Sequence, residues 1–202
     1  MTIDICIPVY KGVKKRWGIK QTLKSLQRTC DVDYNLIVKT GKGPIVEKRL
    51  LCLAESKQPY ILWLDDDIQF TCHTWASRML KRLLSKDNIG VVGVNEMRPN
   101  WRKYKPVKQG SARIIFCGCM LTRKIPGIMF DTAYEALGAE DIDYLYQVRA
   151  AGYTVYQENR IVIIHHKRLD RERTREWREN KSNPAHKSNV DYFIQKWGCS
   201  WN

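Results

Sequence analysis

The sequence lacks the features that would place it in or across a membrane. No apolar run approaches the length of a membrane span, and residues 1–10 have neither the basic start nor the apolar core of a secretion signal. Internal repeats and low-complexity linkers are absent as well, and 202 residues suffice for one domain with a proper core. We therefore expect a cytoplasmic protein with a single domain.

Paired cysteine spacings are also missing. The 7 cysteines are an odd number and are scattered along the chain, which favours reduced thiols over a disulfide framework. Cys117 and Cys119 form half of a typical metal-binding pattern, but no second pair completes it. We interpret these two cysteines as small core residues on a strand.

Acidic residues are scarce relative to basic ones. The chain has 35 Lys and Arg against 21 Asp and Glu, which gives a formal net charge of +14. Such a balance favours a polyanionic partner, either nucleic acid or an anionic membrane surface. The alternative is a solvated basic surface that maintains solubility.

Strand-like and helix-like segments alternate through about the first 95 residues. This alternation predicts an α/β fold, in which a mostly parallel central sheet is flanked by helices. Ligands of such sheets bind beyond the carboxyl ends of the strands. The predicted strands lie within 3–9, 34–44, 60–64 and 88–97, and the second of them ends in a Gly/Pro turn. The predicted helices are at 19–26, 45–56 and 75–85.

The second half of the chain has a different character. Residues 98–113 hold six Lys or Arg and no acid, which is typical of a loop, and residues 113–122 predict a strand. Residues 130–153 predict a loop that leads into a helix, and 154–167 a strand that ends in paired histidines. Residues 167–181 carry dense charge of both signs and are expected to form an exposed helix or an ordered tail.

Three consecutive aspartates follow the apolar strand YILWL. Asp65, Asp66 and Asp67 repel one another, and the strand before them places them at the edge of the sheet. Clustered carboxylates of this kind bind Mg²⁺ or Mn²⁺, whose remaining ligands are typically substrate phosphates. An exposed acidic turn is the alternative.

Two later segments add candidate functional side chains. Glu140 and Asp141 begin a predicted helix, where the helix dipole keeps a carboxylate ionised and ready to accept a proton; capping of the first turn is the alternative. His165 and His166 end a strand, so their side chains point to opposite faces and one of them is expected to reach a metal site.

The order of four segments resembles the GT-A glycosyltransferases, specifically the nucleotide-sugar-dependent enzymes of family 2. These segments are DICIPVY, YILWLDDDI, GAEDIDYLYQVRAAGY and IVIIHH, and the later DYFIQKWG is also similar to a segment of that family. The resemblance implies a GT-A (Rossmann-like) fold. It implies a domain at 1–166, with a nucleotide-sugar-binding half (1–97) and an acceptor and catalytic half (98–166), followed by a basic extension at 167–202 packed on the domain.

The resemblance also implies roles for individual residues. Asp67 would hold Mn²⁺ or Mg²⁺, with His165 a likelier additional ligand than His166, while Asp141 of the Glu140–Asp141 pair would be the general base of an inverting transfer. The donor would contact Ile7, Pro8, Val9, Tyr10, Asp65, Asp66 and Gly118. Family members usually carry an acidic residue after the second strand, where this chain has Lys39-Thr40-Gly41-Lys42-Gly43, so the nucleotide stays open and the lysines would instead meet phosphate.

The acceptor has to be inferred from the basic residues. Residues 98–113 would lie between the donor and acceptor halves, where cations and aromatic rings suit phosphate contacts and stacking on exposed bases. This predicts a DNA acceptor, for example a hydroxymethylated pyrimidine in bacteriophage DNA, and a phage protein would act in the host cytoplasm. The expected acceptor contacts are Trp101, Arg102, Lys103, Tyr104 and Lys105.

Three other functions stay open at the level of sequence. A lipid-linked or cell-envelope glycan would also bring a basic enzyme to an anionic surface, although residues 167–181 offer a poor apolar face for a membrane. A metal-dependent nuclease or nucleotidyltransferase shares the acidic clusters and the basic charge, but no Gly-rich phosphate loop follows the first strand. The last is a nucleic-acid-binding protein without catalytic activity.

Overall fold

A computed structural model describes most of the chain. The described residues are 1–9, 18–97, 109–112, 115, 117–134, 138–166 and 184–200. The strands are β1 (Ile3–Pro8), β2 (Tyr34–Lys39), β3 (Tyr60–Leu64), β4 (Ile68–Phe70), β5 (Ile89–Met97), β6 (Gly110–Ser111), β7 (Cys119–Arg123) and β8 (Thr154–His165). The helices are α1 (Ile19–Thr29), α2 (Ile45–Glu55), α3 (Trp75–Leu84), α4 (Glu140–Ala150) and α6 (Pro184–Trp197).

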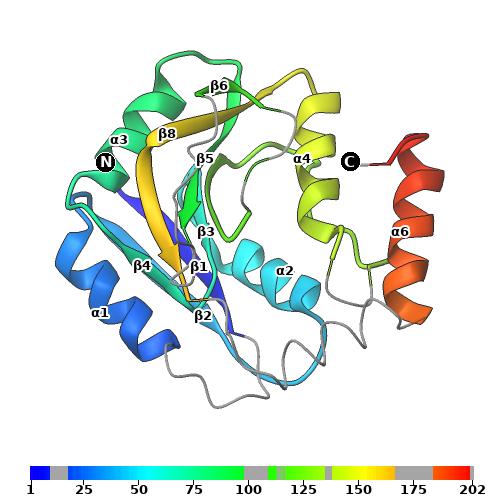
Figure 1. The fold of residues 1–202 in the computed structure, drawn as a ribbon, viewed down its shortest axis with the longest axis horizontal. Coiled ribbons are helices and arrows are strands. Elements are labelled where there is room, and N and C mark those ends of the chain that lie inside the picture. Colours follow the sequence, from blue (N-terminus) through cyan, green and yellow to red (C-terminus); the bar gives the residue numbers. More distant parts are fainter. Residues whose placement is uncertain are drawn as a thin grey trace.

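All the strands belong to one sheet with helices on both faces (Figure 1), which confirms the predicted α/β fold. The strand order is β2-β1-β3-β7-β5-β8-β4, and β6 pairs with β8. β1 runs parallel to β2 and β3, and β5 runs parallel to β8, while β7 is antiparallel to both β3 and β5. Strands β1, β3, β5 and β8 therefore point the same way, and their carboxyl ends share one edge of the sheet.

Apolar side chains alternate between the two faces of the inner strands, as the pleat requires. On β3, Leu62 and Leu64 pack into the core under α1 and α3, whereas Ile61 and Trp63 pack into the core under α2, α4 and α6. β3 is buried on both faces, as its continuous apolar sequence predicts. This burial fixes where the strand ends and hence where the aspartates after it lie.

One boundary agrees with the sequence prediction and another differs. The strand predicted within 34–44 ends at Lys39 in the expected Gly/Pro turn, where Gly41 and Gly43 adopt positive φ angles and lead the chain into α2. The strand predicted at 113–122 is observed as β7, which begins only at Cys119, after a turn at Cys117 and Gly118. β7 lies between β3 and β5, so the two halves predicted at 1–97 and 98–166 interleave in a single sheet.

α6 packs against α4 and the loop before it through a buried polar cluster. Asp143 accepts hydrogen bonds from Trp197 Nε1 (2.7 Å) and from Lys196 Nζ, which also donates to Asp131 at 2.7 Å. Tyr192 Oη donates to Asp131 at 2.9 Å. These contacts join the C-terminal part of the chain to the domain.

Two further predictions concern cysteines and membranes. The 7 cysteines are free thiols, as their spacing predicts, and Cys117 and Cys119 are buried. In the part of the chain that the structure describes, no helix has the length and apolarity needed to cross a membrane.

Candidate metal centre

The three aspartates lie in a short connection at the carboxyl edge of the sheet. β3 ends at Leu64, and the chain then enters β4, which pairs antiparallel with the end of β8. This pairing sets Ile68 opposite His165. This pairing brings together Asp65 and His165, which are 100 positions apart in the sequence.

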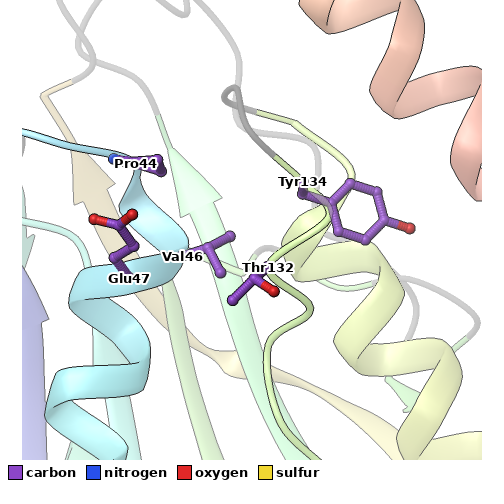
Figure 2. A pocket seen from close by; sticks show the side chains of 5 residues that line it. All are labelled: Pro44, Val46, Glu47, Thr132 and Tyr134. Carbon is purple, nitrogen blue, oxygen red and sulfur yellow. The ribbon is translucent and has the colours of Figure 1, made fainter.

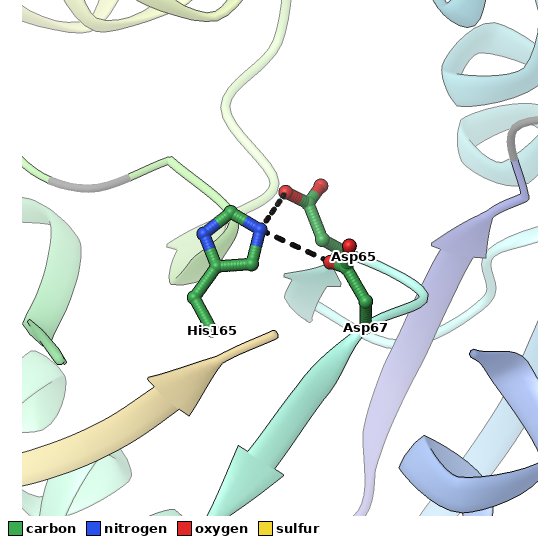
Figure 3. Close-up of side chains that lie close together, drawn as sticks. All are labelled: Asp65, Asp67 and His165. Carbon is green, nitrogen blue, oxygen red and sulfur yellow. Dashed lines mark ion pairs between the residues drawn. The ribbon is translucent and has the colours of Figure 1, made fainter. Parts of the chain in front are cut away.

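Asp65, Asp67 and His165 form a cluster with the geometry of a metal site (Figure 3). Each residue offers one ligand atom, and these atoms lie within 4.8 Å of one another. His165 Nε2 is 3.0 Å from Asp67 Oδ1 and 3.9 Å from Asp65 Oδ2. The Asp67 side chain is 3% exposed and that of Asp65 is 36% exposed, so the cluster opens on the side of Asp65.

A second carboxylate fixes the imidazole from its other side. Glu96, near the end of β5, has Oε1 2.9 Å from His165 Nδ1. Burial would lower the pKa of His165, but its hydrogen bonds to Asp67 and Glu96 and the charge of Asp65 raise it to about 9. A ligating histidine typically has such a carboxylate partner, which orients the ring and increases its basicity as a ligand.

The donor set fits a divalent cation. Carboxylate oxygens suit Mg²⁺ and Mn²⁺, and a neutral imidazole nitrogen is a common metal ligand. Two carboxylates and one imidazolium carry a net negative charge, and a cation bound at Nε2 would take the place of its proton. The chemistry of these three residues therefore matches the metal predicted from the sequence.

His166 faces a different partner. Its Nε2 lies 2.8 Å from Gln69 Oε1, and its backbone N–H donates to Asp67 O at 2.9 Å. The two histidines thus separate as the alternation along a strand requires, and His165 is the one beside the aspartates. The predicted role of His166 as a metal ligand has no counterpart in the cluster, and it stays a prediction.

Other predicted donor contacts lie along the same edge. The backbone N–H of Asp65 donates to Gly118 O at 2.8 Å, which places Gly118 beside the cluster, and Val9 N–H donates to Lys39 O at 2.8 Å. Asp66 is buried, and its carbonyl accepts a hydrogen bond from Thr22 Oγ1 of α1. The Lys39 side chain forms an ion pair with Glu55 at the end of α2.

The predicted catalytic pair begins α4. Glu140 is buried, and its Oε2 accepts a hydrogen bond from Gly138 N–H at 2.8 Å. Asp141 is half-buried, and its Oδ1 accepts a hydrogen bond from the N–H of Ile142 at 2.8 Å. Burial and the nearby charge of Asp141 raise the pKa of Glu140 to about 7, although Arg49 acts in the opposite direction.

Arg49 of α2 is the buried partner of Glu140. The side chains are 5% and 4% exposed, and Arg49 Nη1 lies 3.5 Å from Glu140 Oε1. Burial opposes the charge of Arg49, but Glu140, Asp141 and Asp65 together raise its pKa, so the guanidinium stays charged.

Sequence reasoning missed Arg49 and Glu96. Glu96 carried a usable signal, since it is an acidic residue near the carboxyl end of a predicted parallel strand. Tyr10 and the predicted acceptor residues lie outside the described residues, as do 167–181. The predicted acceptor residues are Trp101, Arg102, Lys103, Tyr104 and Lys105.

A cavity of about 410 Å³ opens between α2 and the loop before α4. Figure 2 shows its lining on two sides, with Val46 and Glu47 at the start of α2 and Thr132 and Tyr134 in the loop. Pro44 completes the lining. Val46 lies one helical turn before Arg49, so the cavity adjoins the helix that carries this buried cation.

Several solved structures resemble this chain in fold. Neither a protein-family model nor a curated protein matches the chain. The chain is similar to residues 1–349 of TarS from S. aureus in complex with UDP-GlcNAc, at a TM-score of 0.67 and 13% identity over 86% of this chain and 61% of that one. It is also similar to the mannosyltransferase PcManGT from Pyrobaculum calidifontis with GDP-Man and Mn²⁺ (TM-score 0.65, 11% identity, 96% and 64% covered).

A third similar structure is GalNAc-T7 with UDP, GalNAc and Mn²⁺, at a TM-score of 0.62 and 10% identity over 84% of this chain and 44% of that one. The chain thus spans between 44% and 64% of the lengths of these structures. Its fold is that of the nucleotide-sugar-dependent GT-A glycosyltransferases, as the sequence predicts.

Proposed function

We propose that the protein is a metal-dependent glycosyltransferase that moves a sugar from a nucleotide-sugar donor to an acceptor hydroxyl. The observation that carries this proposal is the cluster of Asp65, Asp67 and His165 at the carboxyl edge of a GT-A sheet. Substrate phosphates commonly complete the coordination of a cation held by one or two carboxylates. The donor diphosphate would therefore lie over Asp65, the more exposed of the two aspartates.

The rest of the donor would follow the same edge. Pro8 ends β1 and Val9 follows it, and β1 is the parallel neighbour of β3, after which the aspartates come. Gly118 has no side chain to crowd a sugar next to Asp65. These residues, with Tyr10, Asp66 and Lys39, form the proposed donor site, and Lys39 would have to leave Glu55 to reach a phosphate.

Asp141 is proposed as the general base. Glu140 points into the protein toward Arg49, whereas Asp141 is half-exposed at the start of α4. Asp141 would accept the proton of the acceptor hydroxyl while the oxygen of that hydroxyl attacks the anomeric carbon. The bond between the anomeric carbon and the diphosphate oxygen would break at the same time. A bound Mn²⁺ or Mg²⁺ supplies neutralisation of charge on the leaving diphosphate. Attack opposite the leaving group inverts the anomeric centre.

A panel of donors tests this proposal. Nucleotide sugars with Mn²⁺ should raise the melting temperature, because a ligand that binds only the folded state stabilises it by mass action. Asp141→Asn should keep this response and lower the rate of transfer at least about a hundredfold. No response of the wild-type protein to any donor in a full panel would contradict the proposal.

Nucleic acid is proposed as the acceptor, with a hydroxymethylated DNA base as its most specific form. The support is the net charge of +14 and the basic stretch 98–113, which includes Trp101 and Tyr104. A mass-shift assay with mixed nucleotide sugars should compare modified DNA, unmodified DNA and glycan acceptors. DNA binding should also weaken steeply with added salt.

Two outcomes would count against a DNA acceptor. Transfer to a lipid-linked or cell-envelope glycan, without transfer to modified or unmodified DNA, would show that the acceptor is a glycan. DNA binding that is undetectable or insensitive to salt would remove nucleic acid as a partner. Either result leaves the proposed transfer from a nucleotide sugar in place.

A further inference from the structure

Arg49 is a buried cation whose surroundings connect the two acidic parts of the site. α2 turns it inward on the same face as Val46 and Cys52, and its side chain is 5% exposed. Nε and Nη1 make no hydrogen bond within the described residues. Since burying an arginine is costly, a nearly enclosed guanidinium with two nitrogens that make no hydrogen bond indicates a role that helix packing alone does not explain.

An aromatic ring holds the guanidinium in place. Cζ of Arg49 lies 4.8 Å from the centre of the Phe130 ring. Phe130 stacks on Tyr144 of α4 with ring centres 4.7 Å apart. It also lies nearly perpendicular to the Trp63 ring of β3, with ring centres 4.9 Å apart. The position of Arg49 is therefore tied both to α4 and to the strand that precedes Asp65.

Glu140 connects this cation to the turn that starts α4. One of its oxygens, Oε1, faces Arg49 at 3.5 Å, and the other accepts the Gly138 N–H at 2.8 Å. Ala139, between Gly138 and Glu140, has a φ of +76°, a left-handed conformation that costs about 1 kcal/mol for a residue with a side chain. A turn of this kind persists only where its surroundings hold it.

We infer that Arg49 is a positioning residue, which holds the first turn of α4 through Glu140 and so fixes Asp141 relative to Asp65 of the metal cluster. The positive charge of Arg49 also offsets the negative charge of Glu140, its buried partner. This inference rests on the proposed function, because it assumes that Asp141 meets the acceptor.

Arg82 provides a matched control. It lies on α3, its Cζ is 4.5 Å from the centre of the Tyr156 ring, and its Nε is 3.4 Å from Glu158 Oε2. The chemistry is therefore that of Arg49, an arginine over an aromatic ring beside a carboxylate, but none of its partners belongs to the site. Arg49→Met and Arg82→Met remove the same kinds of contact from two places, with the Arg82 side chain 31% exposed and that of Arg49 5% exposed.

The first experiment follows amide hydrogen exchange across residues 138–143. Arg49→Met should speed exchange there about tenfold or more, because the turn loses its anchor, while Arg82→Met should leave these residues unchanged. Glu140→Gln removes the other partner of the Arg49–Glu140 ion pair and should also speed exchange. This variant tests the inference if Arg49→Met does not fold. Unchanged exchange in both Arg49→Met and Glu140→Gln would overturn the inference.

The second experiment follows the charge of Glu140 by carbon NMR of its carboxyl group. Arg49→Met should make Glu140 ionise at a pH at least about one unit higher, since the cation that favours its charged form is gone. Arg49→Lys should restore part of the difference, and Arg82→Met should not change the titration. An Arg49→Met protein in which Glu140 titrates as in the wild type would overturn the inference.

Kinetics separate this inference from the proposed function. With a donor identified, Arg49→Met should lower kcat about tenfold or more with the affinity for Mn²⁺ unweakened, because the Asp65, Asp67 and His165 ligands are retained. An unchanged kcat would overturn the role of Arg49 and would leave the proposed function in place. If the wild-type protein binds no donor, the proposed function fails, and exchange and titration still decide whether Arg49 holds the turn.

Discussion

Two buried aspartates of the same sheet have opposite surroundings. Asp4 on β1 accepts hydrogen bonds from Ser56 Oγ, the N–H groups of Lys57 and Gln58, and Asn35 Nδ2, at 2.7 to 2.9 Å. Asp67, at the other edge, shares one imidazole with a second carboxylate. A carboxylate such as Asp4, whose oxygens accept hydrogen bonds from neutral donors, stabilises the fold. Carboxylates that gather around an imidazole concentrate negative charge, which favours the binding of a cation.

The largest effect is expected at the metal cluster. Asp67→Asn should lower the rate of sugar transfer by about a thousandfold or more, because the cation loses its most buried carboxylate ligand. Circular dichroism should show that the fold is retained. Transfer within tenfold of the wild-type rate would show that Asp67 holds no catalytic cation.

The matching change at the other edge should affect folding instead. Asp4→Ala leaves three or more donors without an acceptor and should lower the free energy of unfolding by about 3 kcal/mol. Asp87→Ala, at an exposed acidic residue, serves as the control and should change it by less than about 0.5 kcal/mol. Denaturant titration measures both, and equal effects would remove the structural role of Asp4.

The pH dependence of stability should have opposite signs for Asp4 and Glu140. Burial opposes the charge of Asp4, but its hydrogen bonds lower its pKa below 3.8, so its contribution is complete above that pH and is lost as the pH falls through the folded value. The pKa of Glu140 is raised from 4.5 to about 7, so its contribution is complete below pH 4.5 and is lost as the pH rises to about 7.

Denaturant titrations of Asp4→Asn and Glu140→Gln between pH 3 and pH 8 check these signs. Asp4→Asn should flatten the fall in stability at the acid end, and Glu140→Gln should flatten the fall between pH 4.5 and pH 7. A Glu140→Gln protein with the wild-type pH dependence in that window would contradict the burial of an ionisable Glu140.

The smallest effect is expected at the strained turn before α4. Ala139→Gly should raise the free energy of unfolding by about 0.5 kcal/mol, because glycine adopts the positive φ of this position without a steric cost, and its greater freedom in the unfolded chain offsets part of the gain. Thermal and denaturant unfolding measure the change. A loss of more than about 1 kcal/mol would mean that the turn is not strained.

Much of this arrangement follows from the sequence. The alternation of YILWL between two cores places the aspartates at the carboxyl edge, and the end of the IVIIHH strand places a histidine there too. Strand alternation also separates His165 from His166. These conclusions need only local patterns and the rule that ligands bind at this edge.

Other parts of the site depend on tertiary packing. Glu96 reaches His165 because the pairing of β5 with β8 shifts register between Val94 and Asn95, which no local pattern reveals. Arg49 faces inward although a charged side chain on a helix is ordinarily exposed. The short β4 is likewise not predicted, since its three residues are too few for a strand pattern and its place in the sheet depends on pairing with β8.

Binding of Mn²⁺ to the wild-type protein, to Asp67→Asn and to Asp4→Asn tests the central claim most directly. Electron paramagnetic resonance should show one Mn²⁺ site in the wild-type protein and in folded Asp4→Asn, with tighter binding when the cognate nucleotide sugar is present. Asp67→Asn should lose this site. Equal binding of Mn²⁺ to the wild-type and Asp67→Asn proteins would contradict a metal centre at Asp65, Asp67 and His165.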